Sequence, residues 1–135
     1  MNDFDILIHK KDLPEVLKVF SELGYFSTGE LLGKSAQEHD QFSHHLPLFL
    51  SKSLNLMIRT HWELHTPMKS YHLDYKSLWE RVVEFNFYGL DIKALSAEDN
   101  LHHLCVHLSI FEAGAREVGD IINLIRAFRD KFNWY

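Results

Sequence analysis

The sequence contains little that would cross-link or anchor the chain: one cysteine, three prolines and six glycines in 135 residues. The single cysteine, Cys105, excludes an intramolecular disulfide, and we expect it to pack inertly in the core. No apolar run approaches the roughly 20 residues of a membrane-spanning helix, and no basic-then-apolar leader opens the chain. Gly-x-Ser-x-Gly, P-loop and glycine-rich dinucleotide motifs are also absent. These absences favour a soluble, cytoplasmic protein without a membrane partner.

The composition does supply enough apolar material for one folded domain. Hydrophobic residues make up 46% of the chain, so we expect residues 1–135 to form a single domain with a real core. The net charge of −5 with neutral histidines argues against a broad nucleic-acid surface, which is normally basic. Ten histidines are many for this length, and only their spacing can indicate a metal site.

A first strand is predicted from Asp3 to Ile8. Because side chains alternate along a strand, Asp3 and Asp5 share a face. Two carboxylates this close repel each other unless a cation lies between them, and carboxylate oxygens suit Mg²⁺ or Mn²⁺. Enzymes that transfer phosphoryl or nucleotidyl groups hold their metals with such pairs. The alternative is a solvated start of an edge strand. The opposite, core-facing side carries Phe4, Ile6 and Ile8.

A helix is predicted to begin at Asp12 and to end at Gly24. Asp12 can accept from the free backbone N–H groups of the first turn, with Glu15 three residues later, as a capping box requires. Pro14 in the first turn costs no hydrogen bond, and Gly24 favours a C-terminal stop. The apolar stripe of this helix consists of Leu13, Val16, Leu17, Phe20 and Leu23.

Two further strands are predicted at residues 44–50 and 54–64, paired antiparallel through a short turn. Pro47 cannot donate to a ladder, so the first is predicted to be an edge strand or to carry a bulge. One face of the second strand is polar. It is either a solvated outer surface or a site surface that meets Asp3 and Asp5, if the strands are neighbours. This face carries Arg59, His61, Glu63 and His65.

The C-terminal half is predicted to be mostly helical. Asp74 is expected to cap a helix that continues through Phe85, and residues 87–95 contain a short strand or only a connection. Ser96 begins the next helix, and a final helix covers about 116–131. The predicted fold class is therefore α+β: a small mixed β-sheet with packed helices and a C-terminal helical hairpin.

A second candidate metal site involves the two C-terminal helices. His103 and His107 lie one turn apart on the same helix face. With Asp120 from the next helix they could form a two-His, one-carboxylate site for a transition metal. The alternative is that His107 makes a hydrogen bond across the hairpin and locks the two helices together. The His-Glu-x-x-His pattern of zinc hydrolases is absent.

Taken together, these segments resemble a family of largely uncharacterised nucleotidyltransferases in the DNA polymerase β-like superfamily. The similarity extends over most of the chain, and the order and spacing of its pieces make it specific. It begins with the Asp-x-Asp strand, continues with Asp12-Leu13-Pro14 and Leu23-Gly24-Tyr25, and includes His44-His45-Leu46-Pro47-Leu48 and His61-Trp62-Glu63-Leu64. It ends with residues 95–108 and Asp120-Ile121.

The resemblance implies a nucleotidyltransferase-like fold and a reaction. Asp3 and Asp5 would hold Mg²⁺ (or Mn²⁺), and a nucleotidyl group would pass from an NTP to an unknown acceptor hydroxyl as pyrophosphate leaves. The third carboxylate of the family falls at position 59, where this chain has Arg59. Glu63 is then the expected substitute as a catalytic metal ligand, and Arg59 and His61 are expected to contact the nucleotide.

A second departure concerns the start of the chain. Superfamily members carry a Gly-Ser turn upstream of the Asp-x-Asp strand, and Met1 leaves no room for it. We therefore expect a family member that lacks its N-terminal part, which would leave an open sheet edge that favours a homodimer or another partner strand. The alternative function is then a catalytically degenerate nucleotidyltransferase domain that binds nucleotide or protein.

Overall fold

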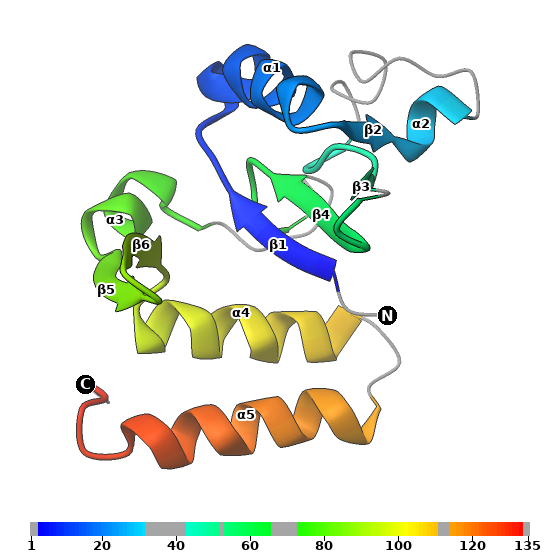
Figure 1. The fold of residues 1–135 in the computed structure, drawn as a ribbon. Coiled ribbons are helices and arrows are strands. Elements are labelled where there is room, and N and C mark those ends of the chain that lie inside the picture. Colours follow the sequence, from blue (N-terminus) through cyan, green and yellow to red (C-terminus); the bar gives the residue numbers. More distant parts are fainter. Residues whose placement is uncertain (1–2, 32–42, 52, 66–72, 111–113, 134–135) are drawn as a thin grey trace. The chain divides into compact units, whose positions relative to one another are not determined.

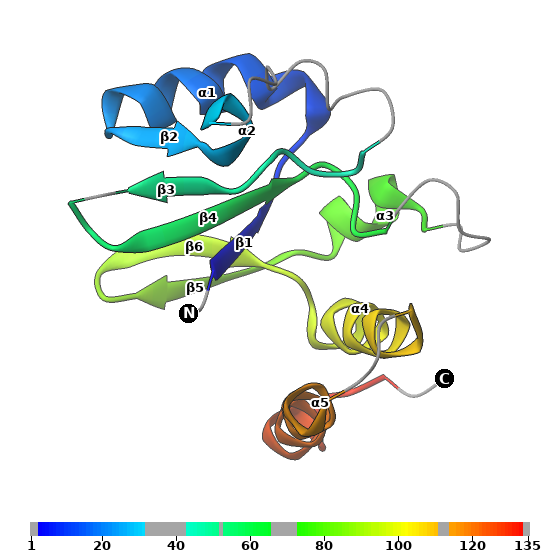
Figure 2. The same cartoon turned by 90° about the vertical axis from the view of Figure 1, so that its right-hand side faces the viewer.

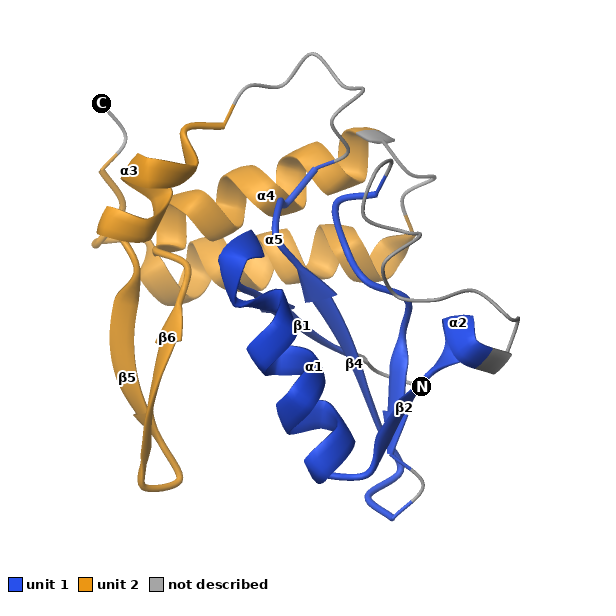
Figure 3. Ribbon diagram, turned by 90° about the horizontal axis from the view of Figure 1, so that it is seen from above, with its two compact units in different colours: residues 1–71 blue, residues 72–135 orange. Residues whose placement is uncertain are grey.

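The computed structural model describes residues 3–31, 43–51, 53–65, 73–110 and 114–133. The chain divides into two compact units, Met1–Tyr71 and His72–Tyr135, coloured blue and orange in Figure 3. We name them the N-terminal unit and the C-terminal unit. The single domain expected for the whole chain stays a prediction. In the described part of the chain, no helix has the length and apolar character needed to cross a membrane.

A four-stranded mixed sheet forms the centre of the N-terminal unit (Figure 1), in the order β1-β4-β3-β2. β1 runs parallel to β4, and the other neighbours are antiparallel. Parallel neighbours need a long crossover, which here contains helix α1 (Leu13–Glu22). The small mixed sheet of the α+β prediction is confirmed. Its strands are β1 (Asp3–Leu7), β2 (Tyr25–Ser27), β3 (Phe49–Ser51) and β4 (Leu56–His61).

The alternation predicted for β1 is confirmed at its centre and wrong at one position. Ile6 packs against the core, whereas the side chain of Asp5 is 62% exposed. Phe4 was expected in the core but is 59% exposed. β1 is an edge strand, so no further strand of this sheet covers its outer side. Among the described side chains of β1, only that of Ile6 packs against the buried core of the unit.

Helix α1 covers the sheet with four residues of the predicted apolar stripe, Leu13, Val16, Leu17 and Phe20 (Figure 2). The fifth, Leu23, follows the end of the helix and is 60% exposed, so its predicted place on the stripe is wrong. Gly24 follows the helix with a φ of +74°, the left-handed conformation that glycine adopts without strain. The predicted cap at Asp12 is wrong. Asp12 ends a 3₁₀ turn, η1 (Lys10–Asp12), in a helical conformation, so its carboxylate makes no capping hydrogen bond. The buried core consists of Phe20, Leu46, Phe49 and Trp62.

The predicted antiparallel pairing of the two central strands is confirmed, with shorter strands than expected. β3 lies between β4 and β2, so the edge position predicted from Pro47 is wrong. The ladder is instead interrupted before β3: His45 forms an isolated bridge with His61, and regular pairing resumes at Phe49. β4 ends at His61, three residues before the predicted end. A short helix, α2 (Thr28–Leu31), follows β2.

In the C-terminal unit, Asp74 caps helix α3 (Tyr75–Glu80) as predicted: its Oδ1 accepts from the backbone N–H groups of Lys76 and Ser77 at 3.1 and 3.3 Å. The predicted continuation of this helix is wrong. Residues 83–94 form a hairpin of β5 (Val83–Phe87) and β6 (Leu90–Ala94), and β6 confirms the alternative of a short strand within residues 87–95. Tyr88 and Gly89 turn the chain with φ values of +51° and +85°, which suits a tight hairpin turn.

The C-terminal helical hairpin is confirmed by the packing of α4 (Ala97–Ile110) against α5 (Ala115–Phe128). Ser96 caps α4, since the backbone N–H of Asp99 donates to its Oγ at 3.1 Å. Val106 is buried on this helix. Cys105, however, is exposed; the prediction of a core position is wrong, because neighbouring positions of a helix lie about 100° apart and Val106 turns inward.

Candidate functional site

The polar face of the N-terminal unit is built by β1 and β4. Asp5 is in register with Arg59, and Leu7 is in register with His61. Paired residues of a ladder project to the same side of the sheet. The parallel pairing therefore gathers the polar residues of both strands on one face, which is the neighbourhood that the site-surface interpretation of the sequence requires.

An Asp–His pair joins the two strands. The Nε2 atom of His61 lies 3.1 Å from Oδ1 of Asp5. A carboxylate oxygen accepts, so Nε2 carries the hydrogen and donates; in the neutral ring the lone pair is then on Nδ1. His61 is mostly covered, with 16% of its side chain exposed. Its Nδ1 is buried and has no hydrogen-bond partner among the described residues.

Two more imidazoles reach this pair from the segment before β3. The backbone N–H of Trp62 donates to the carbonyl of His44 at 3.0 Å, and Nδ1 of His45 donates to the carbonyl of Leu46 at 2.8 Å. Ring centroids are 4.6 Å apart for His44 and His45, 5.2 Å for His45 and His61, and 5.6 Å for His44 and His61. We name His44, His45 and His61 the histidine cluster.

The surroundings of His44 keep this ring uncharged at neutral pH. Burial is the main reason that the pKa of His44 falls from 6.5 to about 4. The positive charges that His45, His61, His65 and Arg59 can carry lower it further, since each disfavours a proton on His44. At pH 7 His44 is therefore a neutral ring with one lone pair available.

Asp3 and Asp5, two of the predicted metal ligands, both lie on β1. The backbone of Asp3 lies in β1, in register with Met57, and its side chain lies outside the described part of the structure. Asp5 is exposed, and Arg59 occupies the neighbouring register position on β4. An arginine adds a cation where the resemblance implies a carboxylate, and its planar fork suits phosphate oxygens.

Glu63 lies in a bend beyond the end of β4. Its backbone N–H donates to the carbonyl of His44 at 3.3 Å. The alternation that would put Glu63 on the same face as Asp5 ends with the strand at His61, so strand geometry no longer determines where its carboxylate points. Its role as a ligand stays a prediction.

The donor chemistry of β1 fits a magnesium ion. Mg²⁺ takes hard oxygen ligands and is commonly held by one or two carboxylates together with waters and substrate phosphates. Asp5 offers one such carboxylate, on the strand that also carries Asp3. Among the described side chains, which exclude that of Asp3, no group of three or more His, Cys, Asp or Glu residues is arranged to hold a metal ion.

The second candidate metal site is not assembled. The rings of His103 and His107 lie 6.0 Å apart on α4, and Asp120 is exposed on α5. Over the residues that the structure describes, these three side chains do not form a metal-binding group. The two-His, one-carboxylate interpretation is therefore not supported by the geometry.

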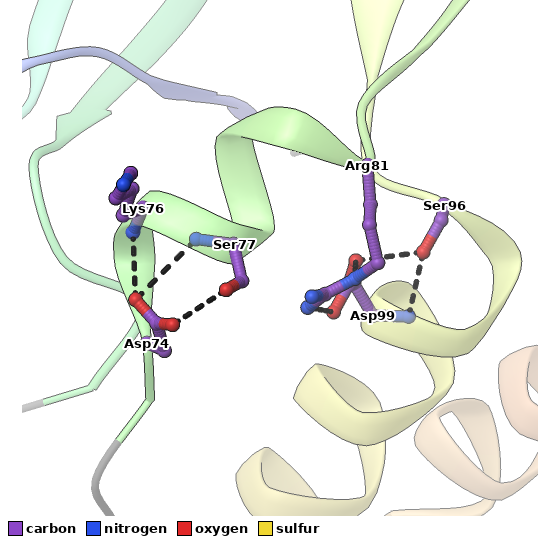
Figure 4. A network of polar contacts seen from close by, with 6 residues as sticks. All are labelled: Asp74, Lys76, Ser77, Arg81, Ser96 and Asp99. Carbon is purple, nitrogen blue, oxygen red and sulfur yellow. Dashed lines mark hydrogen bonds and ion pairs between the residues drawn. The ribbon is translucent and has the colours of Figure 1, made fainter.

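A polar network of a different kind lies in the C-terminal unit (Figure 4). Arg81 donates from Nε to Oδ2 of Asp99 at 3.0 Å and from Nη2 to Oδ1 at 2.6 Å, and the Ser96 hydroxyl donates to Oδ2 at 2.7 Å. Burial alone would raise the pKa of Asp99, but the hydrogen bonds from Arg81 and Ser96 outweigh it and lower the pKa below 3.8. Both carboxylate oxygens have partners, so this network ties the start of α4 to the end of α3.

The analysis of the sequence did not identify His44 and His45 as site residues. A signal was available, because the predicted antiparallel pairing of residues 44–50 with 54–64 already sets these histidines against the end of the second strand. Arg81 and Asp99 had no comparable signal, since the hairpin that brings them together was itself not predicted.

A family model described as an uncharacterised nucleotidyltransferase matches residues 1–135. No curated protein and no solved structure matches the chain. The mixed sheet and the accompanying helices are consistent with a nucleotidyltransferase-like α+β fold.

Proposed function

This chain belongs to a family of uncharacterised nucleotidyltransferases, and from that premise we propose that it transfers a nucleotidyl group from an NTP to a hydroxyl acceptor with the help of Mg²⁺. The observation that carries the proposal is the parallel register of β1 and β4. It sets Asp5 beside Arg59 and within hydrogen-bond distance of His61, at 3.1 Å. Carboxylate, guanidinium and imidazole groups on one face of the sheet suit a metal-bound triphosphate.

Each residue of this face has a role in the proposal. Asp3 and Asp5 would hold Mg²⁺, with Glu63 as the candidate third ligand. The bound ion would neutralise charge on the triphosphate and help the acceptor hydroxyl lose its proton. Arg59 donates to phosphate oxygens through its fork, and His61, oriented by Asp5, donates to the nucleotide or to its acceptor. The proposal includes a cytoplasmic location, where NTP is available and a lone cysteine stays reduced.

A second candidate function is a nucleotide- or protein-binding module without transferase activity. The observation that favours it is Arg59 in the register position beside Asp5, because an arginine cannot ligate a metal. A protein partner, including a second copy of the chain, would pair with the edge strand β1.

Calorimetric titration with Mg²⁺ and α,β-methylene ATP, whose α–β bridge cannot be cleaved, tests the shared binding step. We expect Mg²⁺-dependent binding that is lost in Asp3→Asn/Asp5→Asn. Asp130→Asn is the matched control, since it also removes an aspartate charge but lies outside the candidate site. No binding up to millimolar nucleotide would refute the nucleotide site, and equal binding by the double variant would refute the assignment to β1.

Pyrophosphate release then separates the two functions. The protein is incubated with each of the four NTPs, Mg²⁺ and a panel of hydroxyl acceptors of sugar, protein and nucleic-acid type. Release that Asp5→Asn abolishes supports the transferase. Nucleotide binding without release under every condition supports the binding module instead.

A further inference from the structure

The β5–β6 hairpin has one apolar and one polar face. Paired residues of a ladder project to the same side of the sheet, and the register pairs Phe85 with Ile92 and Phe87 with Leu90. The ring centroids of Phe85 and Phe87 lie 6.3 Å apart, as expected for aromatic neighbours on one face. We name the apolar side the hairpin face. It consists of Val83, Phe85, Phe87, Leu90, Ile92 and Ala94.

The hairpin face is not covered by its own unit. All of its residues except Ala94 are between 37% and 68% exposed. Within the C-terminal unit no described helix packs extensively against either strand, and the hairpin extends away from these helices (Figures 2 and 3). A two-stranded sheet is marginally stable in water unless further strands or another layer cover its apolar side. The hairpin face therefore needs a cover that the described part of this unit does not supply.

The charges of the hairpin lie on the opposite face. There Lys93 pairs with Glu84 at 3.5 Å, and Asn86 donates from Nδ2 to Oδ1 of Asp91 at 2.8 Å. The hairpin face itself contains no charged residue, so two copies of the chain can meet there without like charges in contact, although each has a net charge of −5. An uncharged apolar surface resembles the core of a protein interface and lacks the cations that a nucleic acid requires.

The size of the hairpin face matches one side of a protein–protein interface. With about 150–250 Å² for a whole aromatic side chain and less for an aliphatic one, the exposed fractions correspond to roughly 500 Å² of apolar surface. A standard interface buries about 800 Å² on each partner, of which about 55–65% is apolar. The two apolar areas are therefore about equal, and the hairpin face alone provides what a stable dimer needs.

The hairpin face is also complementary to itself. β5 contributes the aromatic rings of this face, and β6 contributes its longer aliphatic side chains. A two-fold axis parallel to the strands exchanges the two sides of the hairpin, so β5 of one protomer would lie over β6 of its partner. The register then sets Phe85 over Ile92 and Phe87 over Leu90, and the symmetry makes each contact twice.

We propose that the hairpin face binds the same face of a second copy of this chain and so forms a two-fold symmetric homodimer. The two hairpins pack as aligned sheets about 10 Å apart. This surface is separate from the edge strand β1, to which the binding-module alternative assigns a partner. The proposal does not rest on the transferase reaction, so its test contains neither nucleotide nor Mg²⁺.

The test is sedimentation velocity of the untagged full chain from micromolar to submillimolar concentration. We expect a dimer with a micromolar or tighter dissociation constant. Phe87→Glu and, separately, Leu90→Glu should raise this constant at least tenfold, because each places a charge in an apolar contact. Leu23→Glu is the matched control and should leave the constant unchanged, since it makes the same substitution at a residue of the N-terminal unit that is 60% exposed.

Three results would overturn the inference: a monomer at every concentration, an unchanged dissociation constant in either hairpin variant, or equal weakening by Leu23→Glu. The first would leave the hairpin face to a different protein, and the other two would point to another dimer surface, such as the edge of β1. Far-UV circular dichroism checks that each variant folds.

Hydrogen–deuterium exchange of the unmodified protein decides the matter if a hairpin variant unfolds. The exchange is measured at two protein concentrations, one below and one above the dissociation constant. Slower exchange of the β5 and β6 amides at the higher concentration supports the proposal, because packing of the hairpin face opposes local opening. The same rates at both concentrations refute it.

Discussion

The histidine cluster of the N-terminal unit and the Arg81–Asp99 network of the C-terminal unit are both partly buried polar groups, but they differ in how completely they are paired. Asp99 accepts from Arg81 and Ser96 through both carboxylate oxygens. The cluster leaves Nδ1 of His44 and of His61 buried without partners in the described part of the chain.

The difference affects how each group of side chains contributes to stability. A network in which both oxygens of a buried carboxylate have partners stabilises the fold. An incompletely satisfied one costs free energy in the empty state, and a ligand can recover that cost.

The largest expected effect on the free energy of unfolding comes from breaking the Arg81–Asp99 network. Arg81→Met keeps the aliphatic stem but leaves the carboxylate of Asp99, whose side chain is 9% exposed, without its cation. We expect a loss of about 2 kcal/mol in the free energy of unfolding, measured by urea denaturation. Asp5→Asn is the comparison, because Asp5 is exposed, and should change stability by about 0.5 kcal/mol or less. Equal losses in the two variants would contradict the distinction.

A second prediction concerns the pH ranges over which His44 and Asp99 contribute to the stability of the fold. The pKa of His44 is lowered from 6.5 to about 4, so its contribution to stability is complete above pH 6.5 and is lost as the pH falls through 4. The pKa of Asp99 is lowered from 3.8, so its contribution is complete above 3.8 and disappears only below that value.

Urea denaturation of metal-free protein between pH 7 and pH 4 checks these windows. We expect the unmodified protein to lose roughly 2 kcal/mol more than His44→Gln over this range. Because the two proteins share all other titrating groups, the difference isolates His44. If both proteins lose the same free energy of unfolding between pH 7 and pH 4, the folded state does not lower the pKa of His44.

The smallest expected effect on the free energy of unfolding tests whether an ion pair stabilises the fold when both of its side chains are exposed. Lys93 and Glu84 form an ion pair at 3.5 Å across the β5–β6 hairpin, with side chains 63% and 69% exposed. Lys93→Ala should change the free energy of unfolding by about 0.5 kcal/mol or less. A loss as large as that of Arg81→Met would mean that burial does not distinguish the two pairs.

Local sequence signals predicted the elements that depend on neighbouring residues. β1, α1, the antiparallel pairing of β3 with β4 and the α4–α5 hairpin all followed from alternation, helical stripes and capping residues. The β5–β6 hairpin was not predicted, because residues 83–85 were assigned to the preceding helix and only a short strand within residues 87–95 was considered. The capping role of Asp12 and the core position of Cys105 also failed, since each depends on the conformation of the turn or helix in which the residue lies.

The sequence by itself determined which residues share a strand face, because side-chain alternation is a local property of a strand. It also indicated the nucleotidyltransferase family, because the order of the motifs can be read directly along the chain. Only the tertiary structure decided that β1 pairs with β4 in parallel, that Arg59 lies beside Asp5, and that His44 and His45 meet His61. Strand neighbours and their register depend on crossover connections and on burial of the shared core, and these involve residues far apart in the chain.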